Sequence, residues 1–259
     1  MKKIIVAIDG PAASGKSTTA KLLAKKLGYV YLDTGAMYRA CALQALREGI
    51  ELSNTTAIIN MMSNLDLSIA FTDSDNAVYL SGKDVSMEIR TPQISSLASA
   101  ISSIPEVRYK MVALQRKLSE NKGVVLDGRD IGTVVFPEAE AKFFMVATLS
   151  ERAIRRHLEL KAKGLEVPLD IVLKELEQRD SADASRAMAP LKPADDSIEI
   201  DTSCLSIEEQ VSVLYDFVMD ILKETNCLSE QYCHPEQSCH SGLEPESNKL
   251  DSCLRRNDK

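Results

Sequence analysis

The feature that most constrains the fold is an apolar run that ends in a glycine-rich loop. Residues 4–9 are IIVAID, and the stretch that follows, GPAASGKS, fits the spacing G-x-x-x-x-G-K-[ST]. An unbroken apolar run of this length is typical of a strand buried on both faces of a parallel sheet. A helix is expected over residues 16–27, with Gly28 as its stop. A strand, a glycine-rich loop and a helix in this order predict an α/β fold with a parallel sheet flanked by helices.

The loop has the composition of a phosphate cradle. Its glycines let successive backbone N–H groups point at anionic oxygens, and the following helix adds the positive end of its dipole. Lys16 supplies a mobile charge for the β and γ phosphates, and Ser17 supplies an oxygen for Mg²⁺. The alternative is a glycine-rich turn with a structural role only. We predict nucleoside triphosphate binding by Gly10, Pro11, Ala12, Ala13, Ser14, Gly15, Lys16, Ser17 and Thr18.

Strands and helices alternate through the first 226 residues. Strands are expected at 29–33, 123–127, 142–148 and 198–202, and helices at 36–47, 150–163, 169–179 and 207–223. Residues 66–85 alternate in polarity and turn at TDSDN, which predicts an antiparallel hairpin inserted between the parallel strands. Helical segments follow, broken at Pro92 and Pro105.

Length and charge exclude some classes of function. The 259 residues, 44% of them hydrophobic, suffice for one domain with an insertion or for two small domains. A formal net charge of −7 gives no general attraction to nucleic acid, so a second phosphate needs a local basic cluster. No apolar run is long enough to span a membrane, and Asp9 interrupts the run that imitates a signal peptide. We therefore expect a cytoplasmic protein with no membrane or nucleic-acid partner.

Two polar clusters directly follow predicted strands. DTGAMYR carries Thr34 and Arg39, and LDGRDIG carries Arg129 and Asp130. Ligands of open α/β sheets bind at the carboxyl ends of the strands, so these four side chains are candidates for one site. The alternative for Arg129 and Asp130 is a surface ion pair beside a turn.

Two further clusters have helical spacing. Arg152, Arg155 and Arg156 share one helix face, and Arg179, Asp183 and Arg186 share another if that helix persists to Ala187. Taken alone, each set is most often a solvated charged face. Beside a phosphate cradle, such arginines can instead surround a migrating phosphoryl group, which chiefly needs positioning and charge stabilisation.

A kinase for small molecules must also exclude water from its site. Residues 150–166 lie between two apolar strands and carry Arg155 and Arg156, so we expect them to form a short helical lid. Replacing either arginine by alanine should then lower turnover strongly.

Taken together in order and spacing, several stretches resemble the bacterial cytidylate kinases, which are nucleoside monophosphate kinases. These are IDGPAASGKST, YLDTGAMYR, EIRTPQISSLAS, PEVR, LDGRDIGTVVF, ERAIRR and QRDSADASRAMAPL, and the resemblance covers about residues 3–222. It implies transfer of the γ-phosphoryl group of ATP to CMP or dCMP with Mg²⁺. It also implies a P-loop nucleoside monophosphate kinase fold with a small antiparallel β insert and a short helical lid. We place the kinase at 1–226, its nucleotide-accepting insertion at about 35–120 and its lid at about 150–166.

The resemblance also implies roles for individual residues. Thr34 and Arg39 would hold the acceptor, Ser99, Arg108 and Asp130 the cytosine edge, Arg129 and Arg186 a phosphate, and Arg179 and Asp183 the sugar. Lys16, Arg129, Arg155 and Arg156 would act in phosphoryl transfer. The chemistry agrees, because the Asp130 carboxylate can accept from the cytosine amine and would repel the carbonyl that uracil carries there. The family more often has serine at the position of Thr34 and more basic residues around Asp183.

Three alternatives stay open for the function. The chain could be a small P-loop kinase for another nucleoside monophosphate, or a non-catalytic nucleotide sensor, although a sensor has no need of a lid that excludes water. NKLD at 248–251 imitates a GTPase motif, but D-x-x-G is absent from the sequence. Either Asp9 or Asp127 could orient Mg²⁺ through water, and a monomer is the default.

Residues 227–259 lack apolar periodicity, and we expect a disordered extension. Their spacing C-x₅-C-H-x₄-C-H lacks the usual zinc knuckle, which makes a metal site the weaker alternative. The residues concerned are Cys227, Cys233, His234, Cys239, His240 and Cys253.

Overall fold

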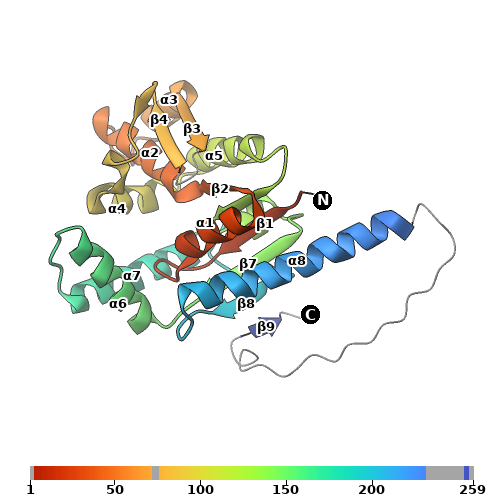
Figure 1. The fold of residues 1–259 in the computed structure, drawn as a ribbon. Coiled ribbons are helices and arrows are strands. Elements are labelled where there is room, and N and C mark those ends of the chain that lie inside the picture. The colour runs from red at the N-terminus through yellow and green to blue at the C-terminus, as the bar shows by residue number, and fades with distance from the viewer. Residues whose placement is uncertain (1–2, 72–75, 232–253, 257–259) are drawn as a thin grey trace.

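The computed structural model describes residues 3–71, 76–231 and 254–256, and its core is a six-stranded sheet in the order β2-β6-β1-β7-β8-β9 (Figure 1). The strands are β1 (Ile5–Asp9), β2 (Val30–Asp33), β6 (Val124–Asp127), β7 (Ala141–Val146), β8 (Ile198–Asp201) and β9 (Leu254–Arg256). All neighbouring strands pair in parallel except β8 and β9. The carboxyl ends of the central strands therefore meet at one edge. The predicted α/β fold with a parallel sheet is confirmed.

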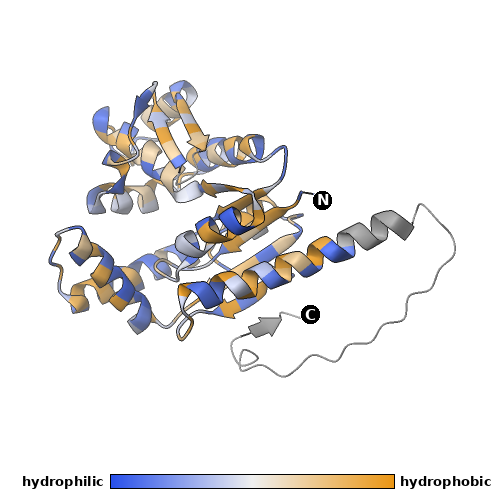
Figure 2. Cartoon of the chain, in the orientation of Figure 1, coloured by the Kyte–Doolittle hydropathy of each residue, from blue (hydrophilic) through white to orange (hydrophobic). Residues whose placement is uncertain are grey.

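Alternation along β1 creates a core on each side of the sheet. Ile4, Val6 and Ile8 pack against α1 (Lys16–Leu27) and α8 (Ile207–Gln231). Ile5 and Ala7 join the opposite core, which includes α2 (Thr34–Arg47) and α5 (Pro105–Leu118). Successive side chains of a strand point to opposite faces, so a strand covered by helices on both sides must be apolar throughout. Figure 2 shows this apolar colouring along the central strands.

The insertion forms a lobe above the sheet in Figure 1. It contains α3 (Thr55–Asn64), β3 (Leu67–Phe71), β4 (Asn76–Leu80), β5 (Lys83–Asp84), η1 (Glu88–Arg90) and α4 (Pro92–Ile101), with the three strands in an antiparallel sheet. The predicted hairpin is confirmed. Pro92 and Pro105 stand at the first positions of α4 and α5, where a missing N–H costs nothing. Helix α3 was not predicted, although Asn54 caps it by accepting from Ala57 N.

The second lobe is the helical pair α6 (Leu149–Ala162) and α7 (Leu169–Ala184). Ala153, Leu160, Val172 and Leu176 bury one face of each helix against the other. Helix α7 extends past its predicted end at residue 179 but stops at Ala184, so the condition that it persist to Ala187 is not met. The chain then turns back, with Leu191 N bonded to the carbonyl of Asp183 and Ala189 at a φ of 54°.

The C-terminal segment is more regular than expected at its two described ends. Helix α8 runs to Gln231, past the predicted boundary at 226, and β9 pairs with the edge of β8. No proline interrupts α8 before Pro235, and β8 would otherwise leave an unpaired edge. Residues Cys233, His234, Cys239, His240, Cys253 and the NKLD stretch lie outside the described residues. Within the described ranges, no helix is long and apolar enough to cross a membrane.

Candidate active site

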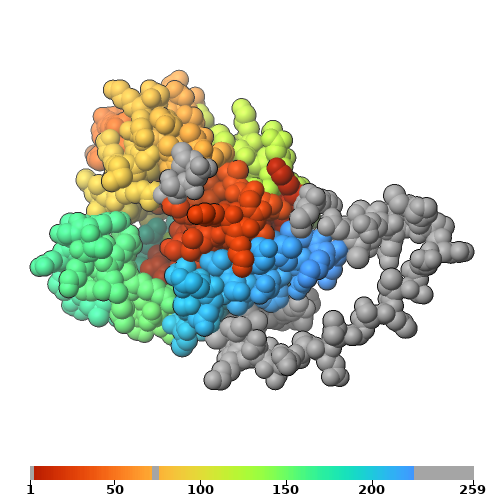
Figure 3. Space-filling model, viewed as in Figure 1, coloured from red at the N-terminus to blue at the C-terminus, as the bar shows by residue number. Residues whose placement is uncertain are grey.

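A cavity of about 540 Å³ lies at the carboxyl edge of the sheet, between the insertion and the α6–α7 pair. Figure 3 shows the two lobes standing on either side of the N-terminal segment. Of the predicted site residues, the cavity lining lacks Gly10, Pro11 and Arg155. It includes Ala12, Ala13, Ser14, Gly15, Lys16, Ser17, Thr18, Thr34, Arg39, Ser99, Arg108, Arg129, Asp130, Arg156, Arg179, Asp183 and Arg186.

At two positions of the loop the backbone conformation strongly favours glycine. Gly10 has a φ of 143°, and a Cβ there would lie 2.1 Å from the Met145 carbonyl oxygen. Gly15 has a φ of 94°, and a Cβ there would lie 2.8 Å from Gln210 Oε1. Both combine a backbone conformation that side chains disfavour with close contact to a neighbour. Gly10 therefore shapes the loop from behind, although it does not line the cavity.

Lys16 is the first residue of α1, and its side chain is buried. Its Nζ donates to Pro11 O at 2.5 Å and to Ser14 Oγ at 3.3 Å, both neutral oxygens. Burial, followed by the charge of Arg129, lowers the pKa of Lys16 well below its ordinary value. A triphosphate in the loop would reverse this effect, because its negative charge favours the protonated amine.

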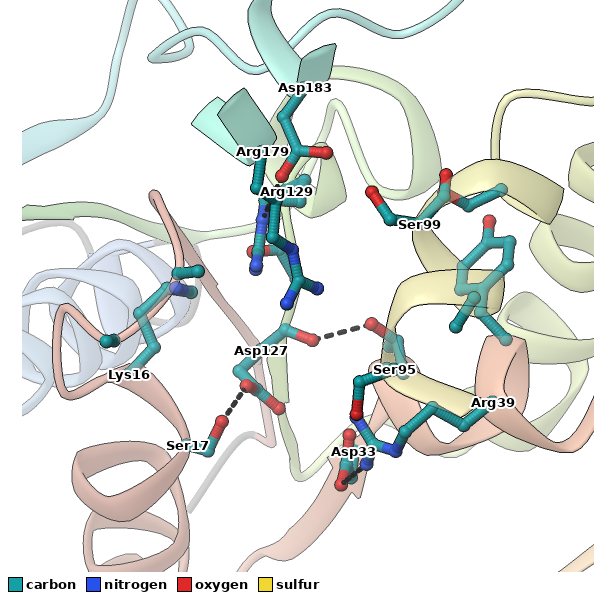
Figure 4. Close-up of a pocket in the computed structure, with 18 of the residues that line it drawn as sticks. Lys16, Ser17, Asp33, Arg39, Ser95, Ser99, Asp127, Arg129, Arg179 and Asp183 are labelled. Carbon is teal, nitrogen blue, oxygen red and sulfur yellow. Dashed lines mark hydrogen bonds and ion pairs between the residues drawn. The ribbon is translucent and has the colours of Figure 1, made fainter. Parts of the chain in front are cut away.

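Asp127 ends β6 and reaches the loop from the neighbouring strand (Figure 4). Its Oδ2 accepts from Ser17 Oγ at 2.5 Å, and its Oδ1 accepts from Tyr31 OH at 2.9 Å. Burial, and then the nearby Asp33, raises its pKa. A hydroxyl and a carboxylate side by side are the hard oxygen donors that Mg²⁺ prefers, so this pair fits the ion.

Asp9, the other candidate for orienting the ion, is already engaged. Its Oδ1 accepts from Ile131 N at 2.9 Å and its Oδ2 from Gly132 N at 2.7 Å. Of the two carboxylates, Asp127 is the one bonded to Ser17.

Opposite the loop, phosphate-binding candidates are paired with carboxylates. Arg39 donates to Asp33 Oδ2 at 2.8 Å. Arg129 and Arg186 both donate to Asp183, at 2.9 and 2.5 Å. Burial alone would raise the pKa of Asp183, but Arg129 and Arg186 outweigh burial and lower it. The arginines are thereby held in place without a ligand, while a phosphate, which offers more charge and more oxygens, can compete for them.

A second buried pair joins Arg108 of α5 to Asp130 of the loop after β6. Both side chains line the cavity, and Arg108 also lies over the ring of Tyr38, 6.0 Å from its centroid. Burial raises the pKa of Asp130, with Arg108 as the strongest opposing influence. Ser99 lines the same cavity from α4. The predicted set for the base edge therefore lies together.

The lid arginines separate into two environments. Arg156 lines the cavity and donates to Glu159 Oε2 at 2.7 Å, and Glu159 also accepts from Lys163 at 2.6 Å. Arg155 instead donates to Thr202 O at 2.6 Å and to Thr202 Oγ1 at 3.1 Å. Adjacent helix positions differ by about 100° in direction, which turns one side chain to the cavity and the other to the end of β8.

Several cavity residues were missed from the sequence. Asp33 caps α2 by accepting from Ala36 N, so an acidic residue just before a helix was the available signal. Glu159 and Lys163 have the i,i+4 spacing of a helical ion pair. Arg90 and Ser95 also line the cavity. Both lie in EIRTPQISSLAS, so the resemblance of that stretch to the family was the available signal. Among the described residues, no group of three His, Cys, Asp or Glu side chains could hold a metal ion.

Comparison with known proteins places these residues in a family context. The family model described as cytidylate kinase matches residues 6–220. A cytidylate kinase from Caldicellulosiruptor saccharolyticus is 49% identical over 222 residues, which is 86% of this chain and 98% of that protein. One from Bacillus anthracis is 46% identical over 220 residues, which is 85% and 98%. The matched region contains all the predicted site residues.

Proposed function

This chain belongs to the cytidylate kinase family, and from that membership we propose how its cavity carries out the reaction. The enzyme transfers the γ-phosphoryl group of ATP to CMP or dCMP and gives ADP and CDP or dCDP. The observation that carries the assignment of roles is the arrangement of cations. Lys16 and the loop lie on one side of the cavity, and Arg39 and Arg129 reach it from other elements (Figure 4). Arg186 also lines the cavity.

On the donor side, the backbone N–H groups of the loop and the start of α1 hold the ATP phosphates. Lys16 exchanges its neutral partners Pro11 O and Ser14 Oγ for phosphate oxygens. Ser17 would hold Mg²⁺, and Asp127, which accepts from the Ser17 hydroxyl, would orient it. When bound, the ion neutralises charge on the β and γ phosphates.

On the acceptor side, Arg39, Arg129 and Arg186 bind the phosphate of CMP, with Thr34 beside them. Asp130 accepts a hydrogen bond from the cytosine amine, while Arg108 and Ser99 donate to its acceptors. Arg179 and Asp183 contact the sugar.

The reaction requires no general base, because the attacking phosphate oxygen is already anionic. Catalysis then consists of in-line placement and charge stabilisation by Lys16, Arg129 and the lid. Arg156 reaches the migrating group from the lid and excludes water. Arg155 supports the closed lid from Thr202.

The remaining properties follow from chemistry and charge. We infer that the partners are nucleotides alone, without nucleic acid or membrane, and that the protein is a cytoplasmic monomer. We assign the kinase to residues 1–226, with the insertion at about 35–120 and the lid at about 150–166. The described ends of the extension 227–259 continue α8 to Gln231 and pair β9 with β8.

A coupled assay of ADP release tests the substrate assignment. CMP, dCMP, UMP, AMP and GMP are offered in turn at equal concentration. We expect turnover with CMP and dCMP and much less with the others. Turnover with AMP rather than CMP would contradict the assignment, and ATP binding without turnover on any of the five would favour a sensor.

A further inference from the structure

Asp9 links the two halves of the site through the backbone. It ends β1 immediately before the glycine-rich loop, and its side chain is buried, with 5% of the residue exposed. Its two oxygens accept from Ile131 N and Gly132 N at 2.9 and 2.7 Å. These amides directly follow Arg129 and Asp130. One carboxylate therefore connects the strand that leads into the donor loop with the loop that carries acceptor residues.

We propose that Asp9 is a positioning residue that fixes Arg129 and Asp130 relative to the donor loop. The inference rests on the proposed assignment of those two residues to CMP. Strand β1 is held between β6 and β7, so it forms the fixed side of the link. The loop after β6 is bonded to β1 a first time through Gly128 N and Ile8 O, at 3.0 Å, and Asp9 then holds it beyond the two functional side chains.

The local geometry calls for a carboxylate at this position. Two neighbouring N–H groups need two acceptors, and an amide side chain has one acceptor and would turn its NH₂ toward the other N–H. The negative charge of Asp130 raises the pKa of Asp9, and the positive charge of Lys16 lowers it. Burial raises the pKa of Asp9 to about 7, although both amides oppose this shift.

Asp9→Asn tests the proposal, with Glu140→Gln as the matched control. Glu140 also accepts from a backbone amide of β1, Ile5 N at 3.0 Å, but at the opposite end of the strand. Affinities for CMP and for ATP are measured separately by calorimetry, together with kcat. We expect Asp9→Asn to lower CMP affinity by about 10- to 100-fold with little change in ATP affinity, and Glu140→Gln to alter neither. Unchanged CMP affinity, or equal losses for both nucleotides, overturns the proposal.

The same experiment separates this inference from the assignment of function. Wild-type turnover of CMP, and its loss in Asp130→Asn, report on the function alone. If the wild type turns over CMP and Asp130→Asn lowers that turnover, but Asp9→Asn binds CMP normally, only the positioning role is wrong. If the wild type does not use CMP, the function itself is wrong.

Hydrogen exchange of the wild-type protein covers the case in which Asp9→Asn does not fold. Protection factors of the Ile131 and Gly132 amides are compared with that of the Gly128 amide, whose acceptor is a backbone carbonyl. The series runs from about pH 8 to about pH 4, so that Asp9 takes up a proton. We expect protection of Ile131 and Gly132 to fall relative to Gly128. If the protection factors of all three amides change by the same factor over the pH series, the proposal is overturned.

Discussion

The donor and acceptor sides of the cavity are built in different ways. The donor side comes from one contiguous stretch, residues 10–18, and uses mainly backbone groups and Lys16. The acceptor side is assembled from side chains of α2, α4, α5, the loop after β6 and the end of α7. Lys16 contacts neutral oxygens, whereas four acceptor arginines, Arg39, Arg108, Arg129 and Arg186, are each paired with a carboxylate. A local motif can specify the first side, but only the fold can assemble the second.

This difference separates catalysis from stability. Removing Lys16 deletes a buried amine for which the described residues offer only the neutral partners Pro11 O and Ser14 Oγ. Removing Arg108 leaves the buried Asp130 carboxylate without this partner, which is strongly destabilising. Asp183 is paired with both Arg129 and Arg186, so removing either one takes away one of its two ion pairs. Variants on the donor side should therefore lose activity and keep stability, while variants on the acceptor side should lose some of both.

Lys16→Met tests the donor side and should have the largest effect. We expect kcat to fall by roughly 10²- to 10³-fold, because a charge preorganised at the migrating phosphoryl group is lost. The melting temperature without nucleotide should stay the same or rise, since a desolvated amine is removed. Steady-state kinetics and a thermal melt measure both quantities. A clear drop in melting temperature would contradict the proposal that donor-side variants lose activity but keep stability.

Arg156→Ala and Arg155→Ala form a matched pair on the lid. Arg156 faces the cavity, so its removal should lower kcat by about 10- to 100-fold. Arg155 contacts Thr202, which in turn donates to Ser14 O at 2.9 Å, so its loss should have the smaller effect on kcat. Single-turnover kinetics under saturating substrates compares the two. Near-normal rates in both variants would remove the lid from the mechanism.

Asp130→Asn tests the acceptor side at the base. The shape is kept but the charge is lost, so CMP turnover should fall about 10-fold and the preference for CMP over UMP should narrow. The melting temperature should also drop, because Arg108 remains buried without its ionic partner. Measuring kcat/KM for both nucleotides, together with a melt, distinguishes the two effects. An unchanged ratio of CMP to UMP would place base selection elsewhere.

The sequence predicted most of the donor side because its determinants are local. The expected helix at 16–27 coincides with α1, and Gly28 ends it with a φ of 67°. Glycine is favoured in the loop because of the local φ angle and the close approach of neighbouring atoms. A short sequence motif is enough to specify such local conditions. The parallel sheet was likewise predicted from apolar runs.

On the acceptor side, position after a strand and helical spacing singled out candidate residues, but Ser99, Arg108 and the individual roles came only through the family resemblance. Spacing grouped Arg155 with Arg156, yet α6 turns them toward different neighbours. Spacing put Arg186 on the face of Arg179 and Asp183 only if the helix reached Ala187, and α7 ends at Ala184. The pairing of Arg39 with Asp33 depends on the turn from β2 into α2. The spacing of apolar residues, which predicts helices and strands, does not predict contacts made at such a turn.

The smallest effect is expected from truncation after Asn226. Helix α8 supports the donor side through its first turns, where Gln210 accepts from Thr19 Oγ1 at 2.8 Å and Leu214 and Val218 pack on the sheet. These contacts precede the cut, which removes the last described turn of α8 and β9. Activity should therefore stay near normal, and exposing the edge of β8 should affect solubility more than turnover. Gel filtration, bound-zinc analysis and the CMP assay are compared with the full chain. A large loss of activity or of bound zinc would show that residues 227–259 take part in the kinase, because the donor-side contacts would all still be present.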